Sequence, residues 1–164
     1  MARGQSAGKT NIQLESQWIV GFVDGEGCFF IGLNKNPEMT LGIQVLPEFS
    51  VVQHKRDEQI LYALKDFWKF GVVRKNHGDR LCYRVRGVEH LNKTIIPFFE
   101  KHSLKTKKKV DFLKFRKVLQ LIESKKHLTV EGLLKIDSLR LEMNTGKSKK
   151  KLILIDGKLD LIDI

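Results

Sequence analysis

Long apolar runs are missing from this sequence of 164 residues, and cysteine, histidine and proline are scarce. No stretch approaches the roughly 18 consecutive apolar residues that a membrane-spanning helix needs. The two cysteines, Cys28 and Cys82, belong to no Cys-x-x-Cys pair, and the five histidines lack the spacing of a zinc site. We therefore expect no membrane partner, no zinc, and reduced cysteines that serve as small core or sheet residues.

Negative charge is also in short supply, because 19 Asp and Glu face 30 Lys and Arg, which leaves a net charge of +11. Such an excess predicts a polyanionic partner, with nucleic acid as the leading candidate and an anionic membrane surface as a competitor without specific support. The 41% hydrophobic content and ten Phe indicate one globular domain with a real core rather than a disordered chain.

Hydrophobic periodicity divides the chain into helices and strands. The expected elements are a helix over 16–25, strands over 28–33 and 41–53, a helix over 57–70, a hairpin over 72–86, and helices over 88–99, 107–124 and 129–143. This order predicts an α+β fold, α-β-β-α-β-β-α. We expect an N-terminal extension over 1–14, one domain over 15–147 and a C-terminal tail over 148–164.

Several details follow from local chemistry. Ser16 is a plausible N-cap, and Leu14 or Trp18 with Phe22 would mark the core side of the first helix. Gly71 stands where a left-handed cap of the second helix belongs, and Pro47 inside a strand indicates a bulge or an edge.

The most informative stretch is Trp18-Ile19-Val20-Gly21-Phe22-Val23-Asp24-Gly25-Glu26-Gly27. Gly21 and Gly25 would lie on one helix face, where the missing Cβ atoms let a partner backbone approach closely. The helix would then deliver the Glu26 carboxylate at the end of that contact. The simpler alternative is a glycine-containing core helix that ends in a polar turn.

This stretch resembles the signature of the LAGLIDADG homing endonucleases. The resemblance continues through Cys28-Phe29-Phe30, His127-Leu128-Thr129-x-x-Gly132-Leu133 and Met143-Asn144-x-Gly146, and it covers about Ser16 to Lys147. It implies a twisted antiparallel sheet that forms a DNA-binding saddle, with helices on the other face. It also implies a site-specific double-strand DNA endonuclease, that is, a homing endonuclease encoded by an intron, which hydrolyses phosphodiester bonds.

One copy of the signature implies a homodimer, since two such helices pack together in the family and each supplies one acid. The expected dimer interface consists of Trp18, Gly21, Phe22 and Gly25. The two Glu26 carboxylates would then lie near the twofold axis.

The resemblance also assigns the metal site. Glu26 is the metal-binding acid, and Gly25 contributes a backbone carbonyl to the same ion. The expected cofactor is Mg²⁺; Mn²⁺ is expected to substitute, and Ca²⁺ to bind without supporting cleavage. Asp24 would shape the helix end or contact the metal ligands without binding the metal itself.

Two further catalytic residues are carried over from the family pattern. Gln53 takes the role of a water-positioning amide at a strand end. Lys105 is the first choice for a lysine that stabilises developing charge, with Lys107 and Lys108 as rivals that position alone does not separate.

Recognition of DNA is expected from the sheet, because a twisted antiparallel ribbon fits the major groove. The candidates share non-core faces and loops: Asn34, Lys35, Gln44, Glu48, Ser50, Arg74, Lys75, Asn76, Arg80, Arg84 and Arg86. A symmetric dimer predicts a long pseudopalindromic site and an affinity that falls steeply with salt.

Two other functions remain open at this point. One is an intron RNA-binding splicing factor, or maturase, and the other is a catalytically silent DNA-binding regulator. Retention of Glu26, Gln53 and a nearby lysine favours the endonuclease. The N-terminus shows neither the apolar core of a secretory signal nor a convincing transit peptide. The protein is expected in a mitochondrion or chloroplast if it is encoded there by an intron, and otherwise to be intracellular.

Overall fold

The computed structural model describes residues 11–144 and 150–164, which divide into two compact units. The first unit contains residues 11–28 and 49–109, and the second contains residues 29–48, 110–144 and 150–164. Gly146 and the expected domain boundary at residue 147 lie outside the described residues, as does most of the expected N-terminal extension.

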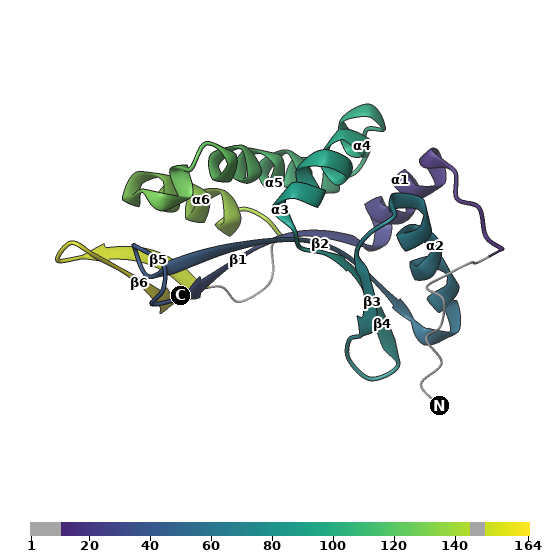
Figure 1. The fold of residues 1–164 in the computed structure, drawn as a ribbon, viewed down its shortest axis with the longest axis horizontal. Helices are drawn as coiled ribbons and strands as arrows, with labels where there is room; N and C mark the ends of the chain where they lie inside the picture. The colour runs from purple at the N-terminus through teal and green to yellow at the C-terminus, as the bar shows by residue number, and fades with distance from the viewer. Residues whose placement is uncertain (1–10, 145–149) are drawn as a thin grey trace. The chain divides into compact units, whose positions relative to one another are not determined.

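The elements follow the predicted order, as Figure 1 shows. The helices are α1 (Ser16–Glu26), α2 (Glu58–Trp68), α3 (Val88–His90), α4 (Ile96–Lys101), α5 (Lys108–Glu123) and α6 (Val130–Leu141). The strands are β1 (Gly27–Lys35), β2 (Ile43–His54), β3 (Val72–Lys75), β4 (Arg80–Val85), β5 (Lys150–Ile155) and β6 (Lys158–Asp163). A π-helical turn, Leu91–Ile95, joins α3 to α4.

The predicted α+β fold is confirmed by a four-stranded sheet with the order β1-β2-β4-β3. A separate two-stranded sheet pairs β5 with β6. β2 is therefore an inner strand where it pairs with β4, and Pro47 lies outside that stretch, which agrees with its interpretation as a residue at a locally unpaired edge. The pairing of β2 with β4 begins at Phe49, two residues after Pro47, so the missing N–H of Pro47 removes no bond from that ladder.

The core of the first unit lies where the apolar faces of β2 and β4 meet α1 and α2. Phe49 and Val51 of β2 lie opposite Val85 and Tyr83 of β4, and all four side chains are buried. Trp68 of α2 stacks on Tyr83 with ring centroids 6.0 Å apart. Burial raises the pKa of the Tyr83 hydroxyl, which donates to the Phe70 carbonyl at 2.9 Å.

Two predicted helix caps are wrong by one or two residues. Glu15 is the N-cap of α1 in place of Ser16, and its side chain makes no capping bond. At the end of α2 the left-handed residue is Lys69, with φ of 68°. Gly71 also has a positive φ, 93°, and a Cβ there would approach Cε2 of Tyr83 to 2.7 Å. Gly71 is needed at that position for close packing against Tyr83 rather than to cap the helix.

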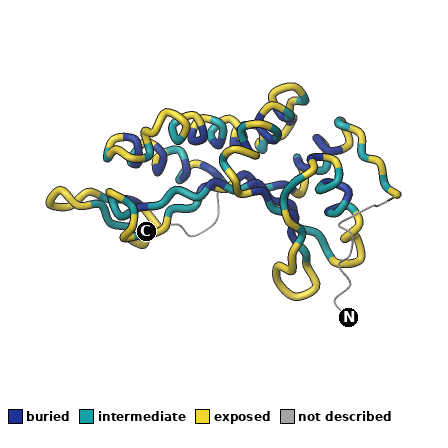
Figure 2. Tube along the Cα trace, in the orientation of Figure 1, coloured by how far each residue is buried: buried dark blue, intermediate teal, exposed yellow. Residues whose placement is uncertain are grey.

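The second unit packs α5 on β1 through aromatic side chains. The Phe29 ring lies 5.4 Å from that of Phe112 and 5.3 Å from that of Phe115, measured between centroids. The Asn144 side chain donates to the Phe29 carbonyl at 2.6 Å just after α6 ends. Buried residues therefore follow the middle of β1 and the inner side of α5, as Figure 2 shows.

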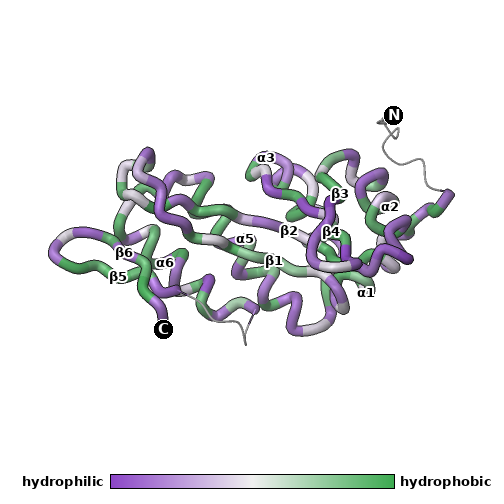
Figure 3. The backbone as a smooth tube through the Cα atoms, turned by 90° about the horizontal axis from the view of Figure 1, so that it is seen from below, coloured by the Kyte–Doolittle hydropathy of each residue, from purple (hydrophilic) through white to green (hydrophobic). Residues whose placement is uncertain are grey.

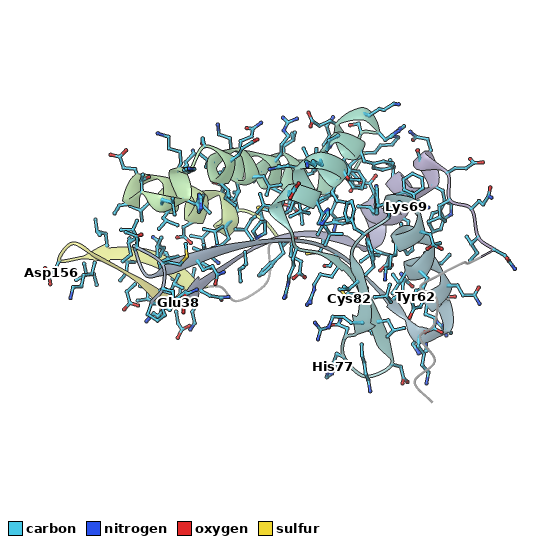
Figure 4. All side chains as sticks on the ribbon, in the orientation of Figure 1. Glu38, Tyr62, Lys69, His77, Cys82 and Asp156 are labelled. Atoms are coloured by element: carbon cyan, nitrogen blue, oxygen red, sulfur yellow. The ribbon has the colours of Figure 1, made fainter. Side chains whose placement is uncertain are left out.

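The C-terminal segment, interpreted as a tail from the sequence, contains a folded hairpin. Asp156 and Gly157 form its turn with φ of 49° and 75°, the pair of positive values that a two-residue hairpin turn requires. Leu152 is buried in a cluster with Ile43 and Leu133. The apolar runs of β5 and β6 flank this hydrophilic turn in Figure 3, and Asp156 marks its tip in Figure 4.

A buried ion pair fastens the hairpin to α6. Asp137 is 3% exposed, and its Oδ1 accepts a hydrogen bond from Nε of Arg140 at 3.0 Å. The other carboxylate oxygen of Asp137 accepts from the Leu152 N–H at 3.0 Å, while Arg140 also donates to the Lys150 carbonyl. The pair therefore satisfies its own polar groups and two backbone groups of β5.

Gly132 in the first turn of α6 is a position where no side chain fits. A Cβ at Gly132 would lie 1.7 Å from the Lys126 carbonyl oxygen and 2.9 Å from Oγ1 of Thr129. The Thr129 hydroxyl caps the helix by accepting from the Gly132 N–H at 3.0 Å, which holds this backbone in place.

We expect Gly132→Ala to lower the free energy of unfolding by about 2–3 kcal/mol, because backbone must shift to relieve the overlap. The measurement is a urea titration followed by circular dichroism. Ser138→Ala at an exposed position of α6 is the control, with an expected change below about 0.5 kcal/mol. Equal midpoints for the two variants would contradict the close packing at Gly132.

The cysteines occupy strand positions as expected, since Cys82 is buried in β4, Cys28 is half-buried in β1 and neither forms a disulfide. Among the helices of residues 11–144 and 150–164, none is long and apolar enough to cross a membrane.

Candidate active site

The last turn of α1 delivers an acidic residue to the surface of the first unit. Ile19, Val20 and Val23 bury one side of α1 and anchor it. The helix gives way to extended backbone at Gly27, where a Cβ would come within 2.6 Å of Cγ1 and 2.9 Å of the carbonyl oxygen of Val23. Glu26, the final helical residue, is exposed, and within the described residues its carboxylate has no hydrogen-bond or ion-pair partner.

The opposite side of α1 carries the residues predicted to form a dimer interface. Trp18 is 44% exposed and stacks on the half-buried Phe22 with ring centroids 4.9 Å apart. A Cβ at Gly21 or Gly25 would meet no atom within 4 Å. The interpretation of Trp18 and Phe22 as the core side is therefore wrong, because Ile19, Val20 and Val23 form that side. The face with the two glycines is open in the single chain.

Asp24 faces the segment that precedes α5. Its carboxylate accepts hydrogen bonds from the backbone N–H groups of Lys105 at 3.0 Å and Thr106 at 3.1 Å, and from the Thr106 hydroxyl at 2.7 Å. Partial burial raises the pKa of Asp24, but the bonds from Thr106 and Lys105 outweigh this effect and leave the pKa below its ordinary value. Both carboxylate oxygens are thus used within the chain, which agrees with the expected role in shaping the helix end.

The three candidate lysines have different surroundings. The Lys105 ammonium is exposed and lies 3.4 Å from the carbonyl of Ser103. Lys108 is half-buried, and its ammonium donates to the carbonyl of Gly27, next to Glu26 in the chain. Lys107 is exposed and also has an interaction partner. The structure therefore brings the Lys108 ammonium and the backbone of Lys105 to the end of α1.

Gln53 lies near the end of β2 and is half-buried. It pairs with Leu81 of β4, and Leu81 pairs in turn with Lys75 of β3. Since side chains alternate along a strand, Gln53 points to the same side of the sheet as Val51 and away from the side of Val52.

The residues at the end of α1 fit a hard divalent cation. Mg²⁺ prefers oxygen ligands and keeps several waters, so one or two carboxylates with substrate phosphates complete its shell. Glu26 offers a free carboxylate, and the Gly25 carbonyl belongs to the last helical turn, where carbonyls lack intrahelical partners. In the described part of the chain no cluster of three or more His, Cys, Asp or Glu could hold a metal by itself. Glu26 and Gly25 would therefore contribute only part of a coordination shell.

The β3–β4 hairpin presents most of the predicted DNA-binding residues of the first unit. Arg74, Lys75, Asn76, Arg80 and Arg86 are exposed, and Arg84 is half-exposed. The turn between the strands is exposed throughout, with His77 at its tip in Figure 4.

Register shows which of these side chains share a face. Arg74 pairs with Cys82 and Val72 pairs with Arg84, so Arg74, Arg80 and Arg84 point to one side of the hairpin. This side is opposite to buried Tyr83, so one face of the hairpin is basic and the other is part of the core.

Other predicted DNA contacts have different environments. Ser50 pairs with Arg84 and is only 8% exposed, so it offers DNA little surface in the single chain, and its predicted contact stays a prediction. In the second unit, Gln44 accepts a hydrogen bond from the Asn36 side chain at 3.1 Å, and Glu48 is half-buried.

The end of β1 offers two further candidates in the second unit. Asn34 is exposed, and Lys35 forms an ion pair with Asp160 of β6 at 2.6 Å. That contact lowers the pKa of Asp160. Lys35 would have to exchange this partner for a phosphate in order to bind DNA.

Comparison with known proteins decides the family. The model of the LAGLIDADG endonuclease family matches residues 19–119, which include most of α1 and the whole four-stranded sheet. The chain belongs to the LAGLIDADG endonuclease family. A crystal structure of a homing endonuclease, I-TnaI, is 57% identical with a TM-score of 0.80, over 83% of this chain and 92% of that one.

Other LAGLIDADG relatives are longer. I-SmaMI, in a crystal structure bound to cleaved DNA, is 42% identical with a TM-score of 0.80, over 83% of this chain and 46% of that one. "Probable intron-encoded endonuclease 2" of Neurospora crassa is 34% identical over 83% of this chain and 30% of its own length. The chain therefore spans less than a third of that curated relative.

Family membership confirms the fold and the family predicted from the α1 signature. The relatives are DNA endonucleases by name. Sequence reasoning overlooked the contact between Asp24 and Thr106. A threonine two residues before the first helical residue, Lys108, was the available signal, since such hydroxyls commonly organise helix starts.

Proposed function

We propose that this chain is a site-specific endonuclease that hydrolyses both strands of a long pseudopalindromic DNA site as a homodimer with Mg²⁺. The observation that carries the proposal is the end of α1, where an unpartnered Glu26 carboxylate follows an open face with two glycines. Two copies joined through Trp18, Gly21, Phe22 and Gly25 would place two such carboxylates together.

The comparisons support this proposal in two ways. I-TnaI, of which the chain covers 92%, is named a homing endonuclease, and the chain covers about half of I-SmaMI, which has been crystallised on cleaved DNA. I-SmaMI has also been observed bound to an uncleaved DNA target in the presence of calcium ions. This agrees with the expectation that Ca²⁺ permits binding without cleavage.

The residues have distinct parts in the proposed reaction. Glu26 and the Gly25 carbonyl would hold the divalent ion, which when bound would activate a water and neutralise charge on the phosphate. Gln53 orients the attacking water through its amide, and the Lys105 ammonium stabilises charge that develops on the phosphate. Basic side chains of the β3–β4 hairpin contact the DNA backbone and bases. Two chains would bring a net charge of twice +11, or +22, to the duplex.

The names of two relatives support a proposal about the location of the gene. They are "Probable intron-encoded endonuclease 2" of Neurospora crassa and "Probable intron-encoded endonuclease Cox1-I1b" of Schizosaccharomyces pombe. We accordingly propose that this chain is encoded by an intron and acts in the organelle that contains its host gene.

The experiment that tests the function is selection from a randomised duplex library in Ca²⁺, followed by transfer of the bound pool to Mg²⁺. A long pseudopalindrome cut on both strands near its centre is the expected result. Binding without cleavage would identify a silent DNA-binding regulator instead. Absence of any duplex enrichment would shift the function to RNA binding.

A further inference from the structure

Asp24 connects two segments of the first unit that are about 80 residues apart in the sequence. It lies in the last turn of α1, two residues before Glu26, and its three donors belong to Lys105 and Thr106. Each donor lies 2.7–3.1 Å from a carboxylate oxygen, and hydrogen bonds to an ionised acceptor are the stronger kind.

The segment between α4 and α5 is largely exposed. Ser103, Lys105, Thr106 and Lys107 are exposed, and Leu104 is the buried residue among them, at 2% exposure. The Thr106 hydroxyl links Asp24 to α5, because it also accepts a hydrogen bond from the Lys108 N–H at 3.2 Å where α5 begins. Asp24 therefore fixes both the backbone of Lys105 and the start of the following helix.

We propose that Asp24 is a positioning residue, which holds the lysine-bearing segment against the end of α1 and thereby sets the location of the Lys105 ammonium relative to Glu26. This inference rests on the proposed endonuclease function. It assigns to Asp24 no contact with metal or substrate, since both of its oxygens are engaged by Lys105 and Thr106. Misplacement of a reacting group by about 1 Å costs on the order of 100-fold in rate, so such a support matters for catalysis.

The central variant is Asp24→Asn, which keeps the shape of the side chain and replaces one acceptor oxygen by an NH₂ donor that cannot accept from an N–H. We expect its single-turnover cleavage rate in Mg²⁺ to fall about 10- to 100-fold. The dissociation constant for duplex DNA in Ca²⁺ is expected to stay within about threefold, because the basic hairpin is untouched. Asp163→Asn, the same change at an exposed position of β6, is the matched control.

A double-mutant cycle separates positioning from a general structural effect. Lys105→Met alone should slow cleavage, and adding Asp24→Asn to it should slow cleavage by no more than about twofold further, because the positioned group is already gone. Thr106→Ser retains the hydroxyl and should cleave at nearly the original rate. Losses that multiply in the double variant, or a Lys105→Met variant as active as the parent, would overturn the inference.

Amide hydrogen exchange tests the same contact without reference to activity. The Lys105 and Thr106 amides should be protected in the parent protein and exchange at least about tenfold faster in Asp24→Asn. If Asp24→Asn fails to fold, Thr106→Val removes one of the three bonds and gives a second variant. Unchanged exchange would refute the positioning role. A parent protein that shows the exchange pattern yet cuts no bound site would refute the endonuclease function instead.

Discussion

Glu26→Gln is expected to reduce the rate of DNA cleavage about a thousandfold or more, while duplex affinity in Ca²⁺ stays within a few-fold of the parent protein. The substitution removes the charge that holds the cation at the end of α1 but preserves the length of the side chain. Because a metal ion contributes several kcal/mol to phosphodiester hydrolysis, and each 1.36 kcal/mol corresponds to a factor of ten, losses of this size follow. Nothing within the described residues depends on Glu26 for folding, since its carboxylate has no partner there.

The measurement is single-turnover cleavage of the selected duplex over a series of Mg²⁺ concentrations. Glu15→Gln, at the other end of α1, is the matched control and should cleave at the original rate because Glu15 makes no side-chain capping bond. Cutting by the Glu26→Gln protein at more than about a tenth of the original rate would remove Glu26 from the metal site.

Gly21→Leu is expected to convert the proposed dimer into a monomer and to abolish double-strand cleavage. A Cβ at Gly21 meets no atom of its own chain within 4 Å, so leucine should be accommodated in the folded monomer. Replacement of glycine inside a helix even favours the helix by about 0.5–1 kcal/mol. The leucine side chain would fill the space that the partner backbone needs, and the two Glu26 carboxylates could no longer meet.

Sedimentation equilibrium separates these outcomes, with the parent protein at twice the mass of the 164-residue chain and the variant at its single mass. Ser138→Leu adds the same side chain to an exposed position of α6 and should leave the mass at that of the parent. A Gly21→Leu protein with unchanged mass would show that the interface lies away from this face. A variant that unfolds more easily than the parent monomer would show that the Gly21 face packs within its own chain.

Much of the fold was predictable because apolar periodicity is long and regular in this chain. The strands around Phe29 and Phe49 and the helices around Leu64 and Phe115 were all identified from it. The exact ends were not predictable, since Glu15 and Ser16, or Lys69 and Gly71, lie within two residues of each other as candidates for one cap, and tertiary packing decides between them. The Asp156-Gly157 turn was a readable signal for the C-terminal hairpin that the sequence analysis did not use.

Helix α1 shows what a hydrophobic pattern cannot predict. Both of its faces are apolar, with Ile19, Val20 and Val23 on one and Trp18 and Phe22 on the other. Periodicity alone cannot distinguish a helix face that packs in the core of its own chain from a face that packs against a second chain. The same limit applies to the lysines before α5. Lys105 and Lys108 have the same side chain, so the sequence alone does not separate them. In the structure the Lys108 ammonium contacts the Gly27 carbonyl, whereas the Lys105 backbone contacts the Asp24 carboxylate.

The direction in which α1 runs has an electrostatic consequence for the site at its end. Aligned peptide dipoles place roughly half a negative elementary charge at the C-terminus of a helix. The last turn of α1 itself contains no basic residue and Glu26 adds its own negative charge, while the Lys108 ammonium at the Gly27 carbonyl offsets part of this pole from outside the helix. A cation at this end therefore meets a negative pole built partly from backbone, which persists when the side chain at position 26 is neutralised. The end of α1 attracts counterions even before DNA arrives, and this attraction weakens as ionic strength rises.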